Sequence, residues 1–192
     1  MADKYKFTGE IKQVGRITLH RIQALKDFRT ISKGDIGGWI EKEENLSQSD
    51  NAWVSENAWV SDNAKVYGDA RVYGNAWVSD NAWVYGDARV YGDAFVSDNA
   101  KVYGDARVYG DARVYGNAWV LSGDDIAWFS NVGSENGTLT AYRTKTGVDV
   151  TRGCFEGTLD EFEEAVNNTH FESKTAKEYK LLIEFIKLRM EG

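Results

Sequence analysis

The 192-residue sequence contains no proline and a single cysteine, Cys154. One cysteine excludes an internal disulfide, and the absence of proline fits strands whose backbone amides are all needed in hydrogen-bonded ladders. The start, MADKYKF, lacks an apolar signal segment, and no run of about eighteen apolar residues occurs. We therefore expect no membrane span and a cytoplasmic location.

The sequence also has fewer basic than acidic residues: 23 Lys and Arg against 30 Asp and Glu give a net charge of -7. This balance disfavours non-specific binding to nucleic acid, although a local basic face is compatible with it. With 42% hydrophobic and 28% charged residues, the composition is typical of a folded chain and not of a disordered one.

Twelve consecutive six-residue units fill residues 51–122, each reading Asn/Asp-Ala-x-Val-Ser/Tyr-Gly/Asp/Glu with little variation. Ala and Val lie two apart, which puts both on one side of a short strand. The Gly, Asp and Asn residues that follow accept tight turns, so we expect the chain to bend after every unit. A small residue beside an inward Val fits the narrow corner of a coil, and the pattern predicts a parallel β-helix.

A second period of eighteen residues indicates three strands per coil, because Ser-acid-Asn begins at Ser61, Ser79 and Ser97. With its aliphatic residue preceded two places earlier by a small one, the repeat resembles the hexapeptide-repeat family. The resemblance implies a left-handed triangular β-helix. The left hand comes from the resemblance alone, since general rules for crossovers favour the right hand.

Residues 1–50 are predicted to form an N-terminal β cap and a degenerate first coil, because an open coil end exposes unpaired backbone. Short strands are expected at residues 5–8, 11–14 and 16–19. The segment from Gly37 to Ser47 stands in six-residue register with the repeat, and that register puts Ile40 and Leu46 at the Ala position. This stretch resembles the beginning of hexapeptide-repeat proteins encoded by phages and prophages.

Residues 123–192 are predicted to form a C-terminal α+β domain. Residues 138–144 and 148–154 alternate around Lys145-Thr146-Gly147 as a hairpin, and Thr158 to Glu161 is a capping box that opens a helix ending near residue 167. A second helix at residues 173–190 has a wide apolar face, which we expect to pack on the hairpin or, alternatively, on a partner helix. With its motifs Trp128-Phe129-Ser130-Asn131-Val132-Gly133-Ser134 and Gly153-Cys154-Phe155, the domain resembles the C-terminal domain of phage and prophage hexapeptide proteins.

The eighteen-residue period assigns the outward residues to three faces. Face one carries Arg-Tyr pairs, which suit a ligand or partner; face two is the most apolar and is expected to mediate self-association as a trimer or dimer; face three alternates Lys with Trp. Alternatively, the aromatic rows only cover the ladder and the Arg-Tyr rows are cation-π packing. The candidate binding residues are Arg71, Tyr73, Arg89, Tyr91, Arg107 and Tyr109, and the candidate interface residues are Trp59, Trp77, Phe95, Ser61, Ser79 and Ser97.

No catalytic residue, metal site or cofactor is predicted. Many hexapeptide-repeat proteins are acyltransferases with a histidine on or near the coils, but His20 and His170 lie outside the repeat, and Cys154 is expected to pack in the hairpin domain. The sequence has no phosphate-binding glycine loop and no paired-ligand zinc pattern. The preferred hypothesis is a phage- or prophage-encoded binding protein with a counter-defence role, which binds or sequesters a host factor or a small anionic ligand. Alternatives are a virion scaffold and a divergent acyltransferase.

Overall fold

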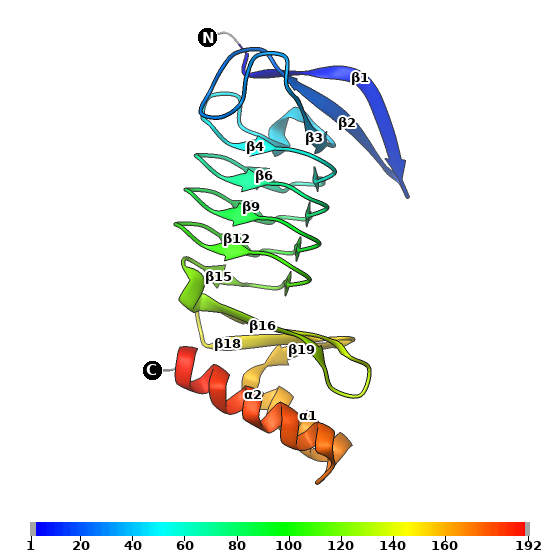
Figure 1. The fold of residues 1–192 in the computed structure, drawn as a ribbon, viewed down its shortest axis with the longest axis vertical. Helices are drawn as coiled ribbons and strands as arrows, with labels where there is room; N and C mark the ends of the chain where they lie inside the picture. The colour runs from blue at the N-terminus through cyan, green and yellow to red at the C-terminus, as the bar shows by residue number, and fades with distance from the viewer. Residues whose placement is uncertain (1–2, 191–192) are drawn as a thin grey trace.

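The computed structural model describes residues 3–190 and shows an elongated molecule built around a triangular parallel β-solenoid. An N-terminal hairpin of β1 (Tyr5–Val14) and β2 (Ile17–Ala24), followed by β3 (Ile36–Ile40), lies at one end (Figure 1). A four-stranded antiparallel sheet and two helices lie at the other. The predicted fold class is confirmed: a mainly β solenoid with a C-terminal α+β domain.

Each six-residue unit forms one two-residue strand, as predicted, and strands eighteen residues apart pair in parallel. Three rows of four strands result: β4-β7-β10-β13, β5-β8-β11-β14 and β6-β9-β12-β15. The second row continues into β3, β2 and β1, so the N-terminal hairpin extends one side of the solenoid. The strands are β4 (Trp53–Val54), β5 (Trp59–Val60), β6 (Lys65–Val66), β7 (Arg71–Val72), β8 (Trp77–Val78), β9 (Trp83–Val84), β10 (Arg89–Val90), β11 (Phe95–Val96), β12 (Lys101–Val102), β13 (Arg107–Val108), β14 (Arg113–Val114) and β15 (Trp119–Val120).

The Ala and Val of every unit point into the solenoid and are at most 1% exposed. The turn residue that ends each of the first eleven units has a positive φ, and it is glycine at seven positions and Glu56, Asp62, Asp80 or Asp98 at the others; the twelfth unit ends at Ser122 in extended backbone. Both features follow from the repeat, because small apolar residues fit the corners and glycine tolerates the left-handed backbone of the turns.

The first coil is two residues longer than the others, which corrects the predicted register. Ile40 pairs with Val60 and Leu46 bridges to Val66, twenty residues away instead of eighteen. Both residues therefore occupy the Val position and not the Ala position. The regular spacing resumes where the Asn51 amide donates to the Gly68 carbonyl, so the two extra residues lie between residues 47 and 51.

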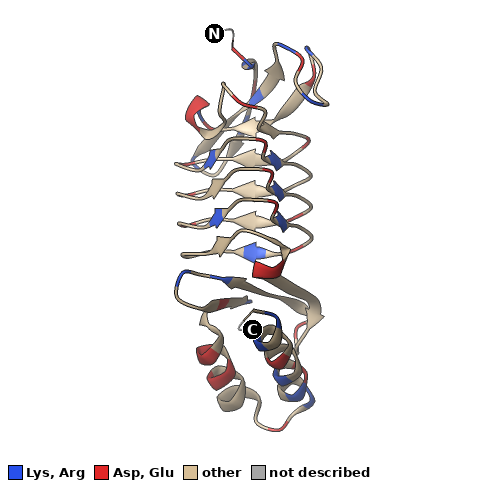
Figure 2. Ribbon diagram, turned by 90° about the vertical axis from the view of Figure 1, so that its left-hand side faces the viewer, with Lys and Arg blue, Asp and Glu red and all other residues tan. Residues whose placement is uncertain are grey.

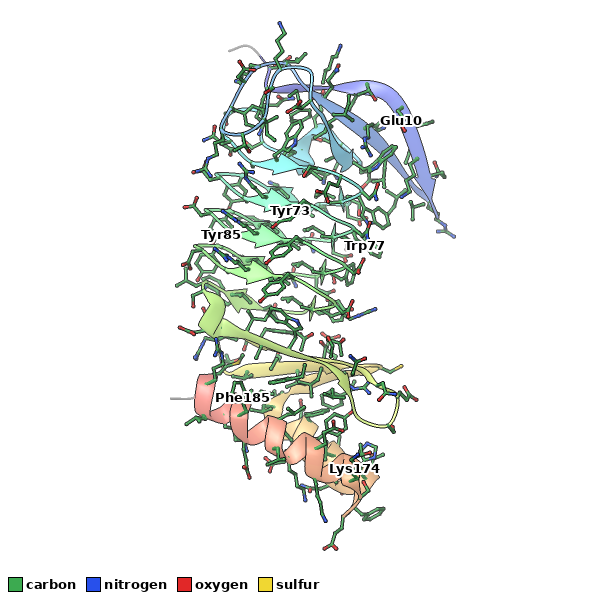
Figure 3. The ribbon with its side chains drawn as sticks, viewed as in Figure 1. Glu10, Tyr73, Trp77, Tyr85, Lys174 and Phe185 are labelled. Atoms are coloured by element: carbon green, nitrogen blue, oxygen red, sulfur yellow. The ribbon has the colours of Figure 1, made fainter. Side chains whose placement is uncertain are left out.

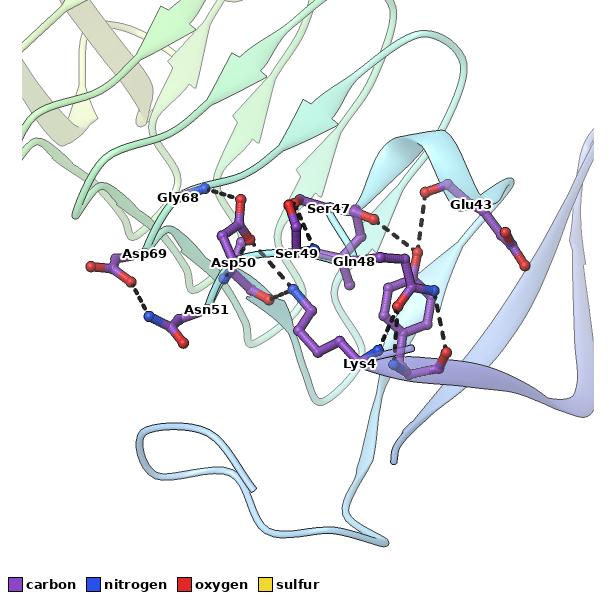
Figure 4. A network of polar contacts seen from close by, with 12 residues as sticks. Lys4, Glu43, Ser47, Gln48, Ser49, Asp50, Asn51, Gly68 and Asp69 are labelled. Carbon is purple, nitrogen blue, oxygen red and sulfur yellow. Dashed lines mark hydrogen bonds and ion pairs between the residues drawn. The ribbon is translucent and has the colours of Figure 1, made fainter. Parts of the chain in front are cut away.

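This longer turn holds the start of the chain in place (Figure 4). The Gln48 side chain accepts hydrogen bonds from the backbone amides of Lys4 and Tyr5, at 2.8 and 3.2 Å. The buried Lys4 ammonium donates to the Ala52 carbonyl at 2.7 Å and lies 3.5 Å from a carboxylate oxygen of Asp50. The first coil is thus closed by polar contacts to β1 and to the residue before it, as well as by apolar packing.

The C-terminal sheet closes the opposite end and contains β16 (Ile126–Val132), β17 (Gly137–Arg143), β18 (Val148–Arg152) and β19 (Phe155–Thr158). Two threonine hydroxyls satisfy the backbone of the last coil: Thr140 accepts from the Arg113 amide, and Thr151 donates to the Arg113 carbonyl, both at 3.0 Å. The predicted hairpin is the central pair β17–β18 of this sheet. Because these hydroxyls replace the next coil, the ladder ends without orphaned groups at Arg113.

Helices α1 (Leu159–His170) and α2 (Lys174–Met190) pack on the far side of this sheet, and the predicted capping box of Thr158 and Glu161 is present. Tyr179, Ile183 and Ile186 are buried. However, the rest of the wide apolar face is not core, because Leu181 is 67% exposed and Leu188 is 81% exposed. The hairpin domain is too narrow to cover the whole face, and only the stripe turned towards the sheet is buried.

Candidate functional site

The outward side chains of the row β4-β7-β10-β13 form a column of positive charge beside a column of rings. Parallel pairing aligns the arginines of β7, β10 and β13, which recur on consecutive coils (Figure 2). Two positions further along, the tyrosine rings stack with centroids 4.7 and 4.9 Å apart, and Figure 3 shows the first of them on the solenoid surface. We term this set the Arg-Tyr ladder: Arg71, Arg89, Arg107, Tyr73, Tyr91 and Tyr109.

The three guanidinium groups of the ladder make no ion pair with any residue between 3 and 190. Neighbouring coils are ~4.8 Å apart, and like charges at about that distance repel by roughly 1 kcal/mol even in water. By contrast, two carboxylates of the aspartate column beside the ladder, Asp69 and Asp87, share an ion pair with Arg29. The ladder is therefore a strip of positive charge without ion pairs to the described residues, on a chain of net charge -7.

The phenol of Tyr91, the middle ring of the ladder, is a hydrogen-bond donor at neutral pH. Burial, followed by the neighbouring hydroxyls of Tyr73 and Tyr109, raises the pKa of Tyr91, while Arg107 and Arg89 lower it to a smaller extent. A raised pKa keeps this phenol protonated, so the Tyr91 O–H remains available to an anion held by the guanidinium groups.

The ladder ends in a cavity of about 560 Å³, which we term the junction pocket because it lies between the last coil and the C-terminal domain. This volume is within the range of small-molecule sites. Its walls come from β13, from β16 and the short 3₁₀ helix before it, and from α2. The lining residues are Asp105, Arg107, Tyr109, Gly123, Ile126, Ala127, Trp128, Phe129, Phe185 and Arg189.

Aromatic contacts fix the walls of the junction pocket. Trp128 meets the last ring of the ladder edge-on, with centroids 4.3 Å apart, and Phe129 meets Phe185 of α2 edge-on at 5.7 Å. Arg189 is held by the Gly123 carbonyl at 3.0 Å and by the Asp124 carboxylate at 3.1 Å. Guanidinium groups bind carboxylates and phosphates, and rings bind flat apolar groups. The arrangement suits an anion that carries an apolar part.

The row of large rings on face two is present, but its serines are not accessible. Trp59 and Trp77 stack at 4.4 Å, and Phe95 follows Trp77 at 4.4 Å. Ser61 is fully buried and accepts a hydrogen bond from the Trp77 indole at 3.4 Å. Ser79 and Ser97 are buried as well, so the three serines cannot meet a partner directly, and the exposed part of this face consists of the rings.

The structure brings together two residues that the sequence left apart. Cys154 and His170 both line a separate hollow of about 360 Å³ beside α1. Cys154 is exposed in the turn between β18 and β19, so the expectation that it packs inside the hairpin domain is wrong. His20 stacks on Phe7 at 4.7 Å in the N-terminal hairpin. Within residues 3–190, no three His, Cys, Asp or Glu side chains are grouped as metal ligands.

Sequence reasoning identified Arg107 and Tyr109 but missed the other wall of the junction pocket. Trp128 and Phe129 stood out only as part of a motif, and Arg189 belonged to an ordinary helix end. Their approach to β13 depends on how the C-terminal sheet docks below the last coil. No local pattern encodes that docking, and the one available signal was the unusual pair of adjacent aromatic residues after the repeat.

Comparisons with known proteins support the repeat architecture. Three stretches, residues 64–80, 82–98 and 106–122, match the sequence profile of the YdcK β-solenoid repeat. The matches cover part of the solenoid, and they establish a repeat-based β-solenoid. The chain shows no significant match to a curated protein. No helix between residues 3 and 190 is long and apolar enough to cross a membrane.

Proposed function

We propose that this chain is a non-catalytic binding protein that holds a small anionic ligand in the junction pocket. The observation that supports the proposal is the position of Arg107: it is the last rung of an unpaired arginine column and also a wall of a cavity rich in aromatic residues. An anion bound there relieves repulsion between the guanidinium groups and gains charge-assisted hydrogen bonds.

In this proposal, the other two arginines of the ladder guide anions towards the pocket. Arg71 and Arg89 attract anions to the same side of the solenoid, and attraction along a charged strip raises the rate of encounter. Tyr109 and Trp128 then offer ring surface to the apolar part of the ligand. Binding of this kind needs no nucleophile and no proton transfer.

Calorimetric titration tests the proposal with four anions: inorganic pyrophosphate, a nucleoside monophosphate, an aryl carboxylate and an acyl-CoA. We expect at least one anion with an apolar part to bind and pyrophosphate to bind more weakly. The variant Arg107→Gln should weaken binding about tenfold, the effect of losing one charge-assisted hydrogen bond.

Arg113→Gln is the matched control, because it removes one exposed arginine from the same coil but from another row. Its affinity should remain within about twofold of that of the unaltered protein. Equal losses in both variants would mean a general charge effect, and no binding of any of the four anions would contradict the proposal. Turnover of the acyl-CoA would instead favour the acyltransferase alternative.

We further propose that this binding takes place in the cytoplasm of a bacterial host. The proposal rests on the resemblance of both ends of the chain to phage- and prophage-encoded proteins. In that setting, the protein acts by sequestering a host-derived anion or a host factor, as a counter-defence protein does. Co-purification of small molecules from bacterial cells, followed by mass spectrometry, tests this extension.

A further inference from the structure

A second groove, on a different side of the solenoid from the Arg-Tyr ladder, follows the row β6-β9-β12-β15. Two hollows of about 390 and 400 Å³ succeed one another along a column of asparagines. We term them together the Lys-Asn groove. Its main side chains are Lys65, Trp83, Lys101, Trp119 and Lys145 beside the column Asn63, Asn81, Asn99 and Asn117.

The asparagine column presents a repeated polar edge. The Asn63 amide donates to Asn81 at 3.3 Å, and the Asn81 amide donates to Asn99 at 3.4 Å. Each exposed side chain keeps one N–H and one oxygen lone pair free of this column. A ligand lying along the solenoid axis therefore finds a donor and an acceptor at every coil, which is a pattern that matches hydroxyl groups.

At the strand positions of this row, lysine and tryptophan alternate from coil to coil. Lys42 adds a cation at one end of the groove, and Lys145 adds one at the other end, 4.5 Å from the Trp119 ring centre. Lys65 and Lys101 lie two coils apart, and Trp83 and Trp119 occupy the coils between and after them. The Lys101 ammonium lies 4.8 Å from the Trp83 ring centre and 5.1 Å from that of Trp119, so it is held between the two. Among the described residues, Glu44 is the one carboxylate that lines either hollow.

We propose that the Lys-Asn groove binds an acidic polysaccharide in which charged and neutral sugars alternate. Coils repeat every ~4.8 Å, close to the length of one β-linked sugar, so the lysine repeat of two coils matches one disaccharide. Each lysine of the row then meets a uronate carboxylate, and the exposed part of each tryptophan, which is 37% of the residue at Trp83, meets the apolar side of a neutral sugar. Asparagine side chains bind the hydroxyl groups of both.

The same features disfavour single-stranded nucleic acid as the ligand of the Lys-Asn groove. A nucleic acid carries one phosphate per nucleotide, whereas the strand row of the groove offers a lysine only at every second coil, and the net charge of -7 repels a dense polyanion.

Calorimetry with defined oligosaccharides tests the proposal. The probe is a hyaluronan octasaccharide, in which glucuronate alternates with a neutral amino sugar; comparison ligands are a chitin oligosaccharide, an oligogalacturonate and oligo-dT. We expect the hyaluronan fragment to bind most tightly. Lys65→Gln with Lys101→Gln should weaken it about tenfold or more, and Trp83→Ala should also weaken it at unchanged melting temperature.

Lys174→Gln with Lys177→Gln is the control, since it removes the same charge from exposed positions on α2 (Figure 3 labels Lys174). Its affinity should stay within about twofold of the unaltered protein. Stronger binding of oligo-dT, equal binding of chitin or oligogalacturonate, absence of hyaluronan binding, or equal losses in the two double variants would each overturn the proposal.

Discussion

At the scale of single residues, the turn glycines show how tightly the coils are stacked. Gly86 has a φ of 69°, and a Cβ built there would lie 3.0 Å from the Gly104 amide nitrogen and 3.1 Å from its carbonyl oxygen. Both neighbours are backbone atoms of the next coil, which cannot rotate away. The position is therefore restricted to glycine by its conformation and by its surroundings.

Gly86→Ala should lower the free energy of unfolding by at least about 1 to 2 kcal/mol, the cost of placing a side chain in the left-handed region. Gly123→Ala is the control, because that glycine has no positive φ and its Cβ would meet nothing within 4 Å. Urea unfolding followed by circular dichroism measures both. Equal stability of the two variants would contradict the stacking argument.

The second prediction at this scale concerns Lys4. Burial lowers the pKa of its ammonium from 10.5 to about 8, although the Asp50 carboxylate raises it. Between pH 8 and 10.5 the unfolded chain then binds more protons at Lys4 than the folded chain. Stability should therefore rise with pH in this window, by up to about 1.4 kcal/mol per pH unit, compared with a Lys4→Met variant. Below about pH 8 the difference between the two proteins should be constant.

Denaturant unfolding of both proteins at several pH values between 7 and 10.5 measures that difference. Lys6→Met, which removes an exposed lysine two residues away, should track the unaltered protein at every pH. A pH-independent difference for Lys4→Met would show that its ammonium is not effectively buried.

At the scale of elements, the sequence predicted the strands, the three rows and the helices because each depends on spacing within one repeat or one turn. The burial of individual outward side chains was harder to predict. The period assigns Ser61 an outward position, but it does not show that an indole from the next coil folds over it. The predicted register of the first coil was wrong for a related reason. A repeat predicts register only where no residue is inserted, and the two extra residues have no periodic pattern of their own.

The inward direction of Val84 in the middle coil leads to an element-scale prediction. Val84→Asp should lower stability by several kcal/mol because it buries an unpaired carboxylate. Trp83→Asp, one residue earlier on the same strand, should cost far less, since Trp83 is 37% exposed. Thermal melting compares the two variants. A similar melting temperature for both would refute the assignment of faces.

At the scale of the whole molecule, self-association through the ring row of face two remains a prediction. Light scattering should give a dimer or trimer for the unaltered protein and a smaller species for Trp59→Glu with Trp77→Glu. The expectation follows from the low cost of desolvating rings compared with charged side chains. The structure adds a second apolar surface, where Leu181 and Leu188 stand exposed on α2.

Leu181→Glu with Leu188→Glu is therefore the comparison variant for that experiment. Dissociation of this variant alone would place the interface on α2. A monomeric unaltered protein would exclude both surfaces under the conditions used.

In the three-row solenoid, the number of six-residue units sets the orientation of the C-terminal domain about the solenoid axis. Each six-residue unit carries the chain from one row to the next, so inserting a single unit would rotate the C-terminal domain by one face about the axis. β16 and α2 would then lie below a different row, and the junction pocket would lose its arginine and tyrosine wall. Inserting eighteen residues would keep the phase and move the domain along the axis by ~4.8 Å. A pocket shared between solenoid and C-terminal domain therefore constrains this protein to grow or shrink by whole coils.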